Sequence, residues 1–171
     1  MAERFNFDSL DIVLPKRQAQ SHKGLYGRVA VIAGSKGMGG AGILASEASL
    51  FCGSGLVSLY THSSNAQASL QRNPEIMTLG VDSHENISGD FDVILIGPGF
   101  SDNKWSKDLS ECISLDAPYG LIIDAGALTY TKKIQSQNNK NLILTPHPGE
   151  AAALLGVCLL YTSPSPRDRV Q

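Results

Sequence analysis

The segment 34–42 combines residues that could bind a phosphate group. Its glycines are Gly34, Gly37, Gly39, Gly40 and Gly42. The segment follows an apolar run and precedes a helix-like stretch, so backbone N–H groups free of Cβ crowding can face an anion at a helix N-terminus. The spacing also satisfies G-x-G-x-x-G, but the run ending at Thr61 and His62 supplies no acidic residue for a ribose, which disfavours an ordinary Rossmann dehydrogenase. A structural tight turn is the alternative.

Two further segments place unusual chemistry after an apolar run. The glycines of Gly97-Pro98-Gly99 would let a flat or phosphorylated ligand approach the backbone closely, or they form a plain turn. Asp124 stands where a carboxylate can orient a hydroxyl or a metal-bound water, although a lone Asp there is also a common helix cap. Neither segment identifies a ligand by itself.

The stretch Thr145-Pro-His-Pro-Gly-Glu150 is the most informative. Pro148 suits the first turn of a helix, and His147 and Glu150 have the spacing of a capping box, so a structural cap is one interpretation. Two prolines also hold the imidazole rigidly, which a cap alone would not require. We therefore expect His147 to contact a ligand.

These segments all follow short apolar runs that read as strands. The runs cover 29–33, 55–60, 91–96, 121–123 and 142–144, and helix-like stretches cover 41–51, 103–113 and 150–155. Strands this uniformly apolar need cover on both faces, which predicts an open, doubly wound parallel sheet with helices on both faces. Ligands bind outside the carboxyl edge of such sheets, so the chemistry-bearing segments mark the predicted site.

Composition restricts the function classes. The chain has 171 residues, 42% of them hydrophobic, and a formal charge of -2 with scattered basic residues, so nucleic acid is not an expected partner. No apolar run approaches the length of a membrane span, and we expect a cytoplasmic protein without a membrane partner. Cys52, Cys112 and Cys158 read as reduced thiols, with Cys52 buried. His62 and His84 are expected in solvated loops.

Three segments are expected along the chain. Residues 1–21 read as a linker or N-terminal extension, and residues 22–156 form the ordered domain. Residues 157–171, which contain Ser-Pro-Ser-Pro and several charges but no periodic pattern, are out of character with the rest. We expect this tail to be non-native and to pack poorly.

A series of motifs in residues 21–156 resembles the ribokinase-like NAD(P)H-hydrate dehydratases. The motifs are Ser21-His-Lys-Gly24-x-x-Gly27-Arg28, the 34–42 loop, Gly53-x-Gly55-Leu-Val57, Pro74-Glu75-x-Met77, Gly97-Pro-Gly99, Asp124-Ala-x-Ala-Leu128 and Thr145-Pro-His-Pro-Gly-Glu150. They occur in the family's order. The resemblance implies a ribokinase-like, mostly parallel α/β sheet that is incomplete in this chain.

The resemblance also implies a lyase of metabolite repair. Such enzymes use ADP or ATP with Mg²⁺ to phosphorylate the hydroxyl of (S)-hydrated NAD(P)H, and elimination of phosphate then restores NAD(P)H. Water is a poor leaving group and phosphate a good one, while the dihydropyridine nitrogen pushes electrons. In family terms Ala41, Gly99 and His147 contact the hydrated dinucleotide. The supporting residues would be Gly34, Gly37, Gly39, Gly40, Gly97, Asp124, Gly149 and Glu150.

Two departures from the family pattern bear on activity. Gly126 stands where the family has the second Asp of Asp-Ala-Asp-Ala-Leu. The family's Gly-Gly-Thr-Gly-Asp motif, with its anion hole and catalytic base, and the preceding nucleotide-binding Lys-Gly segment belong after residue 156 and are absent. We therefore assign no catalytic residue in this chain, the metal ligands stay unknown, and we expect the chain to be inactive alone.

Two other functions stay open. A ribokinase-like kinase could phosphorylate the hydroxyl of a small vitamin precursor and retain the product, although the 145–150 motif favours the dehydratase. A non-catalytic nucleotide-binding module would also lack the downstream motif. The sequence does not choose between ADP and ATP, and the resemblance implies a homo-oligomer at full length, in some members fused to an epimerase domain.

Overall fold

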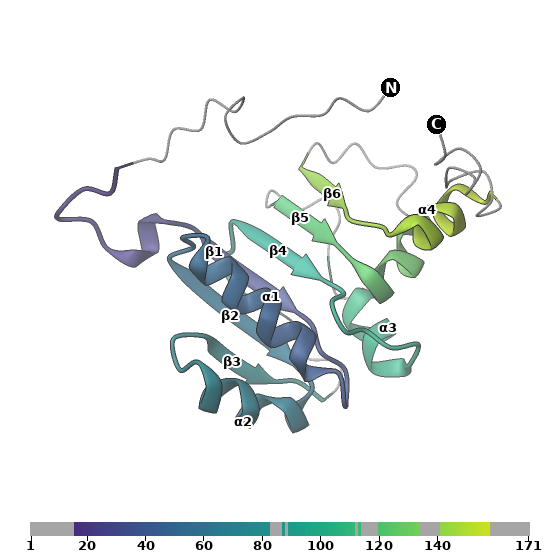
Figure 1. Ribbon diagram of the computed structural model, residues 1–171, viewed down its shortest axis with the longest axis horizontal. Helices are drawn as coiled ribbons and strands as arrows, with labels where there is room; N and C mark the ends of the chain where they lie inside the picture. The colour runs from purple at the N-terminus through teal and green to yellow at the C-terminus, as the bar shows by residue number, and fades with distance from the viewer. Residues whose placement is uncertain are drawn as a thin grey trace, which may run out of the picture.

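The computed structural model describes residues 16–82, 87, 89–111, 113, 120–133 and 141–157. In this part of the chain six parallel strands form one sheet (Figure 1). The strands are β1 (Arg28–Ile32), β2 (Leu56–Thr61), β3 (Met77–Gly80), β4 (Val93–Ile96), β5 (Gly120–Ile123) and β6 (Leu142–Leu144). The helices are α1 (Gly39–Phe51), α2 (Ser63–Arg72), α3 (Lys104–Glu111) and α4 (Pro148–Leu155), with 3-10 segments η2 (Lys23–Leu25) and η3 (Ala125–Lys133).

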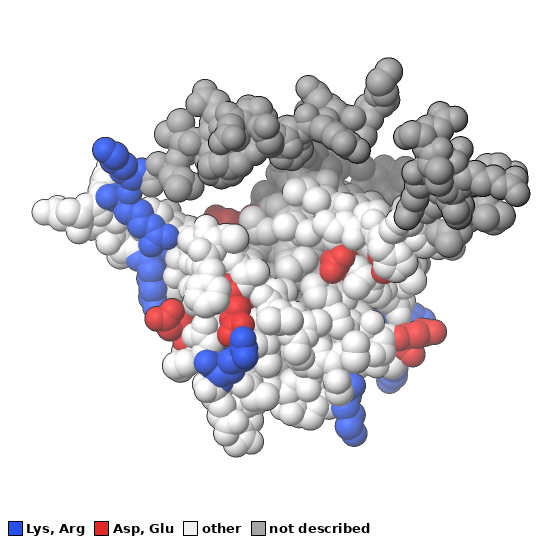
Figure 2. All heavy atoms as spheres, viewed as in Figure 1, with Lys and Arg blue, Asp and Glu red and all other residues white. Residues whose placement is uncertain are grey.

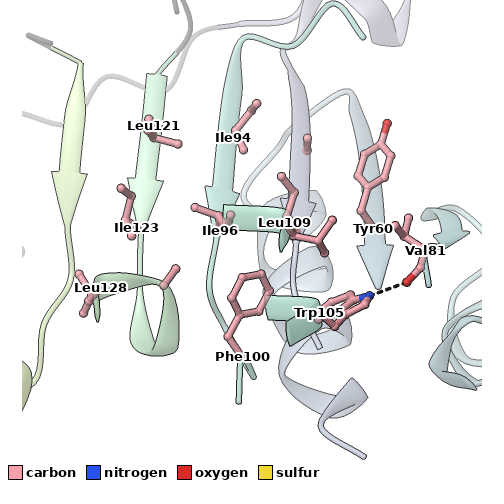
Figure 3. Packing of buried hydrophobic residues seen from close by; sticks show 13 residues of the cluster. Tyr60, Val81, Ile94, Ile96, Phe100, Trp105, Leu109, Leu121, Ile123 and Leu128 are labelled. Carbon is pink, nitrogen blue, oxygen red and sulfur yellow. Dashed lines mark hydrogen bonds between the residues drawn. The ribbon is translucent and has the colours of Figure 1, made fainter. Parts of the chain in front are cut away.

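The sheet is covered on both faces, as the uniformly apolar strands predict. Side chains alternate between the faces along each strand. One face packs against α1, and its buried core is Val31, Ala33, Ile43, Val57, Leu59 and Ile76. The opposite face packs against α3 and η3 (Figure 3), and its larger residues are Tyr60, Ile94, Ile96, Phe100, Trp105, Leu109, Leu121, Ile123 and Leu128. The predicted doubly wound α/β architecture is confirmed.

The strand order is β3-β2-β1-β4-β5-β6 and reverses direction once. The chain runs outward from β1 through β2 to β3, and then returns to pair β4 with the other side of β1. The point of reversal therefore lies between the carboxyl ends of β1 and β4. In open α/β sheets this topological switch point is where a ligand-binding crevice forms.

The helix α2 and the strand β3 were not predicted, and neither were the 3-10 segments η2 and η3. The sequence of α2 is SSNAQASLQR, in which Ser69 is the one buried residue, so the helix has almost no apolar face to reveal it. The strand β3 lies at the sheet edge with Met77 and Leu79 exposed, which removes the apolar pattern expected of a central strand.

One side-chain prediction was wrong and another holds in part. Cys52 is exposed, because it follows the last turn of α1 at the surface and not in its buried face. His62 lies in the connection between β2 and α2 and is partly exposed, but it is also the N-cap residue of α2 and its ring lies 6.0 Å from that of Trp105. His84, Cys112 and Cys158 lie outside the described residues.

The ends of the chain are described in part. Residues 1–15 and 158–171 lie outside the described residues, so the expected packing of the tail stays a prediction. In the described part of the expected linker, the Arg17 guanidinium donates to the Gly53 carbonyl and stacks 4.2 Å from the centre of the Tyr26 ring. Among the described residues, no helix combines the length and apolar character needed to cross a bilayer. Lys and Arg side chains on the face in Figure 2 lie in separate groups, some beside acidic side chains and the rest among uncharged surface.

Candidate functional site

The turns that follow β1 and β4 meet at the switch point. The Gly34 N–H donates to the Pro98 carbonyl at 2.9 Å, and the Ser35 N–H donates to the Gly99 carbonyl at 3.0 Å. Gly99 has φ +69°, and a Cβ there would lie 2.9 Å from the Ala41 Cβ and 2.7 Å from the Met38 carbonyl oxygen. Only glycine tolerates both the backbone conformation and the close packing. The structure thus brings the predicted residues Gly34, Ala41 and Gly99 together.

The Gly34 peptide is held from its other side by the end of β2 and the start of α2. Its carbonyl accepts hydrogen bonds from the Thr61 hydroxyl at 2.9 Å, the Asn65 side-chain amide at 2.8 Å and the His62 N–H at 3.1 Å. Gly39 is packed against the same Asn65, since a Cβ at Gly39 would lie 2.7 Å from its Cγ. The loop is therefore anchored by side chains from a neighbouring strand and helix.

These contacts reduce the number of backbone N–H groups in the 34–42 loop that can face an anion. The N–H groups of Gly34 and Ser35 already donate hydrogen bonds to the Pro98 and Gly99 carbonyls. The first N–H groups of a helix have no intrahelical partner, which leaves those of Gly39 and Gly40 at the start of α1 for a ligand. Gly40 is exposed, and a Cβ there would meet nothing within 4 Å.

Asp124 lies at the end of β5 in contact with both neighbouring strands. Its N–H donates to the Ile96 carbonyl at 3.0 Å, and its carboxylate accepts a hydrogen bond from the Thr145 hydroxyl at 2.7 Å. Gly97, with φ +117°, presses on the same turn, because a Cβ there would lie 1.8 Å from the Asp124 carbonyl oxygen. The non-glycine residue that follows, Ala125, has a positive φ of 47°. Asp124 is thus held in place by its backbone and its side chain.

His147 is the N-cap of α4, as the capping-box interpretation predicts. Its Nδ1 accepts from the Gly149 N–H at 3.0 Å and the Glu150 N–H at 3.3 Å, and the Glu150 carboxylate accepts from the His147 N–H at 2.8 Å. Since Nδ1 accepts, the neutral ring carries its proton on Nε2, which lies 3.3 Å from the other Glu150 oxygen. The His147 side chain is 66% exposed, so the cap leaves it accessible. Ligand contact by His147 stays a prediction.

Glu150 also lines a mostly apolar pocket between η3 and α4. The other lining residues are Leu128, Thr129, Ala153 and Leu154. Within the described residues, no three His, Cys, Asp or Glu side chains gather as a metal-binding group. Among the described residues, Asp124 is the carboxylate that directly follows an inner strand, β5, at the carboxyl edge of the sheet.

Gly126 is closely packed. A Cβ at this position would lie 2.6 Å from the Phe100 carbonyl oxygen and 2.8 Å from the Phe100 Cβ. A larger residue would therefore require the turn after β4 to shift. The family's second Asp has no space at this position in the observed packing.

At the far end of the edge, Asp82 interacts with the start of α2. Its carboxylate accepts from the Ser63 N–H at 3.3 Å and lies 3.8 Å from the His62 Nε2. Hydrogen bonding to Ser63, with a smaller contribution from His62, lowers the Asp82 pKa below its ordinary value. Asp82 adjoins the Gly34 loop through His62, whose N–H donates to the Gly34 carbonyl.

The predicted segments thus adjoin one another along the carboxyl edge of four neighbouring strands. Contacts join Gly34 to Gly99, Gly97 to Asp124, and Asp124 to Thr145. We call residues 34–42, 97–99, 124 and 145–150 the switch-point edge. Sequence reasoning missed two of its internal partners, Ser35 and Thr145. Thr145 could have been found from the sequence, because it comes directly after β6, and β6 lies beside the strand that ends at Asp124.

Known proteins resemble this chain in sequence and in fold. A family model described as NAD(P)H-hydrate dehydratase matches residues 29–168. The bifunctional NAD(P)H-hydrate repair enzyme Nnr of Coxiella burnetii is 37% identical over 163 residues, covering 93% of this chain and 32% of that protein. The ADP-dependent (S)-NAD(P)H-hydrate dehydratase of Staphylococcus aureus is 37% identical over 152 residues, covering 85% and 55%.

Solved structures agree. The ADP/ATP-dependent NAD(P)H-hydrate dehydratase of Bacillus subtilis, co-crystallised with ATP and Mg²⁺, matches with a TM-score of 0.73 and 32% identity, covering 85% of this chain and 53% of that one. A ribokinase-like superfamily protein of Enterococcus faecalis matches with a TM-score of 0.75 and 29% identity, covering 86% and 56%. The chain spans between about a third and somewhat more than half of the curated relatives it matches.

Proposed function

This chain belongs to the NAD(P)H-hydrate dehydratase family, and from that premise we propose that its switch-point edge binds the substrate in an ADP- or ATP-dependent dehydration of (S)-hydrated NAD(P)H. The observation that carries the proposal is the unbroken series of contacts from Gly34 through Gly99 and Gly97 to Asp124 and Thr145. It supports a single ligand-facing surface at the place where open α/β sheets bind ligands. A homo-oligomer at full length and a cytoplasmic location belong to the same proposal.

Each part of the edge has a distinct task in this proposal. Gly99, packed against Met38 and Ala41, keeps the two turns close together where the hydrated ring is proposed to bind. The free N–H groups at the start of α1 favour the negative charge of the dinucleotide's phosphates. His147 hydrogen-bonds the dinucleotide and positions it. Asp124, held by the Thr145 hydroxyl, orients the substrate hydroxyl or a metal-bound water.

The adenine nucleotide, with Mg²⁺, supplies the phosphoryl group that makes the hydroxyl a good leaving group. Mg²⁺ takes oxygen ligands and few of them from protein, so one carboxylate such as that of Asp124 fits its requirements. Stabilising charge on the transferring oxygens needs an anion hole and base. We place these in the family's Gly-Gly-Thr-Gly-Asp motif and not in the switch-point edge.

A titration followed by the amide spectrum of the ¹⁵N-labelled chain tests the binding surface. On addition of (S)-NADPH hydrate, we expect the amide signals of Gly39, Gly40, Gly99 and His147 to shift. Amides of the remote pair Ser69 and Thr78 should stay in place, because this pair joins α2 to β3 away from the switch point. Shifts confined to residues outside the switch-point edge would contradict the proposed site.

The same titration separates the dehydratase from a vitamin-precursor kinase. A hydroxymethylpyrimidine alcohol replaces the hydrated dinucleotide as the ligand. The dehydratase proposal predicts no saturable shifts with this alcohol, since it has no phosphates for the start of α1. Saturable shifts with the alcohol and none with NADPH hydrate would favour the kinase.

A further inference from the structure

Ser35 is completely buried between the two turns that meet at the switch point. Its hydroxyl donates to the Gly99 carbonyl at 2.6 Å and accepts from the Ser101 N–H at 2.9 Å. The Ser101 hydroxyl lies 3.3 Å away. Together with its own N–H, which also donates to Gly99, Ser35 forms hydrogen bonds on both sides of the Gly99–Phe100 segment.

The turn after β4 needs such support because of its glycines. Gly97 and Gly99 both have positive φ, and glycine loses more conformational freedom on ordering than any other residue. One hydroxyl can donate and accept at the same time, which an alanine or cysteine at this position cannot do equally well. Without it, the Ser101 N–H loses its acceptor and the Gly99 carbonyl keeps one donor from Ser35 instead of two.

We propose that Ser35 is a positioning residue whose hydroxyl holds the Gly97–Gly99 turn against the Gly34 loop, so that both present one rigid surface to the dinucleotide. Preorganisation of this kind raises affinity because the bound conformation is already populated in the free protein. The benefit to affinity rests on the proposed function. The effect on the two turns does not, and it is measurable without a ligand.

The first experiment measures amide hydrogen exchange in the ligand-free chain. In Ser35→Ala, we expect the amides of Ser101 and Gly34 to exchange roughly tenfold faster or more, because local opening of the two turns becomes easier. Ser35→Cys keeps the side-chain volume with a weak donor, and it should show the same acceleration. If the alanine variant fails to fold, the cysteine variant carries both measurements.

Ser69→Ala is the matched control. Ser69 is also completely buried, and its hydroxyl is 2.8 Å from that of Thr78, but this pair lies between α2 and β3. Its loss should lower global stability without changing exchange at Ser101 and Gly34. Unchanged exchange at these two amides in both Ser35 variants, or equal acceleration in Ser69→Ala, would overturn the positioning role.

The second experiment measures the Kd of (S)-NADPH hydrate by fluorescence titration. We expect both Ser35 variants to bind roughly three- to thirtyfold more weakly, as the population of the aligned turns falls. Ser69→Ala should bind like the original chain. Faster exchange with unchanged Kd would refute the positioning role. If the original chain does not bind the hydrate at all, the proposed function fails, and hydrogen exchange alone decides whether Ser35 holds the two turns.

Discussion

Three glycines near the switch point should respond to alanine substitution in a fixed order, because the structure gives each a different reason to be glycine. Gly40 lies in the first turn of α1 with open space around it. Gly37 also has open space, but its φ is +83°. Gly97 has φ +117° and the Asp124 carbonyl oxygen only 1.8 Å from where a Cβ would lie.

The expected changes in unfolding free energy follow from these differences. Gly40→Ala should stabilise the chain by up to about 1 kcal/mol, since alanine is the better helix residue. Gly37→Ala should cost about 1 to 2 kcal/mol, which is the penalty of a left-handed conformation. Gly97→Ala should cost about 2 to 5 kcal/mol, because overpacking against a backbone atom adds to the same penalty.

Urea unfolding of the purified chain and the three variants measures this order. The midpoint should shift while the slope m stays constant, which shows that stability changed and not the nature of the transition. If Gly97→Ala were no less stable than Gly37→Ala, the close packing of β4 against the Asp124 turn would be wrong. If Gly40→Ala were as unstable as Gly37→Ala, the open surroundings of Gly40 would be wrong.

Three further predictions concern charged and capping side chains. His147→Ala in the active, full-length protein should weaken substrate affinity more than it slows the bound complex, and the lost cap should cost about 1 kcal/mol in urea unfolding; unchanged affinity would leave the cap as its sole role. Glu47→Gln should lower stability by on the order of 1 kcal/mol in thermal unfolding, since Glu47 is buried and its carboxylate accepts from the Nε and Nη2 of Arg72 at 2.8 and 3.0 Å. The loss should be smaller at high salt, because the Arg72 side chain is exposed to screening ions, and no loss at low salt would refute the prediction. Folding lowers the Asp82 pKa, so the contribution of this carboxylate to the free energy of unfolding is present above the ordinary pKa of 3.8 and is lost as pH falls through the lower pKa of the folded state. Asp82→Asn should therefore make the free energy of unfolding depend less on pH in the acid range, and an unchanged pH dependence would contradict the hydrogen bond to Ser63.

The layered fold and the edge that carries the proposed site both follow from the amino-acid sequence. Uniformly apolar runs at 29–33, 91–96 and 121–123 can be satisfied only between two layers of helices, and the structure confirms a parallel sheet there. Parallel strands direct their carboxyl ends to one edge. The segments that follow them therefore lie along one edge of the sheet, whatever the order of the strands.

Elements without a clear hydrophobic period could not be predicted from the sequence. The helix α2 is almost entirely polar, and β3 is an edge strand with an exposed apolar side, so neither has the periodicity that marks a buried element. Cys52 was expected inside because cysteine usually is, but the end of α1 is at the surface. For α2, β3 and Cys52 alike, exposure depends on where the element lies relative to the core, and the local sequence does not specify this.

The hydrogen bonds that hold the switch-point edge together depend on contacts between distant parts of the chain. Strand order puts β4 beside β1, and this pairing lets Ser35 reach Gly99 and Ser101, which are more than sixty residues away along the chain. The same pairing lets the N–H groups of Gly34 and Ser35 donate to the turn after β4. From the glycine pattern alone, these N–H groups were expected to be free for an anion. Hydrogen bonds between distant residues depend on which strands are neighbours, and the free energy of the whole packed sheet sets that choice, not the residues of any one segment.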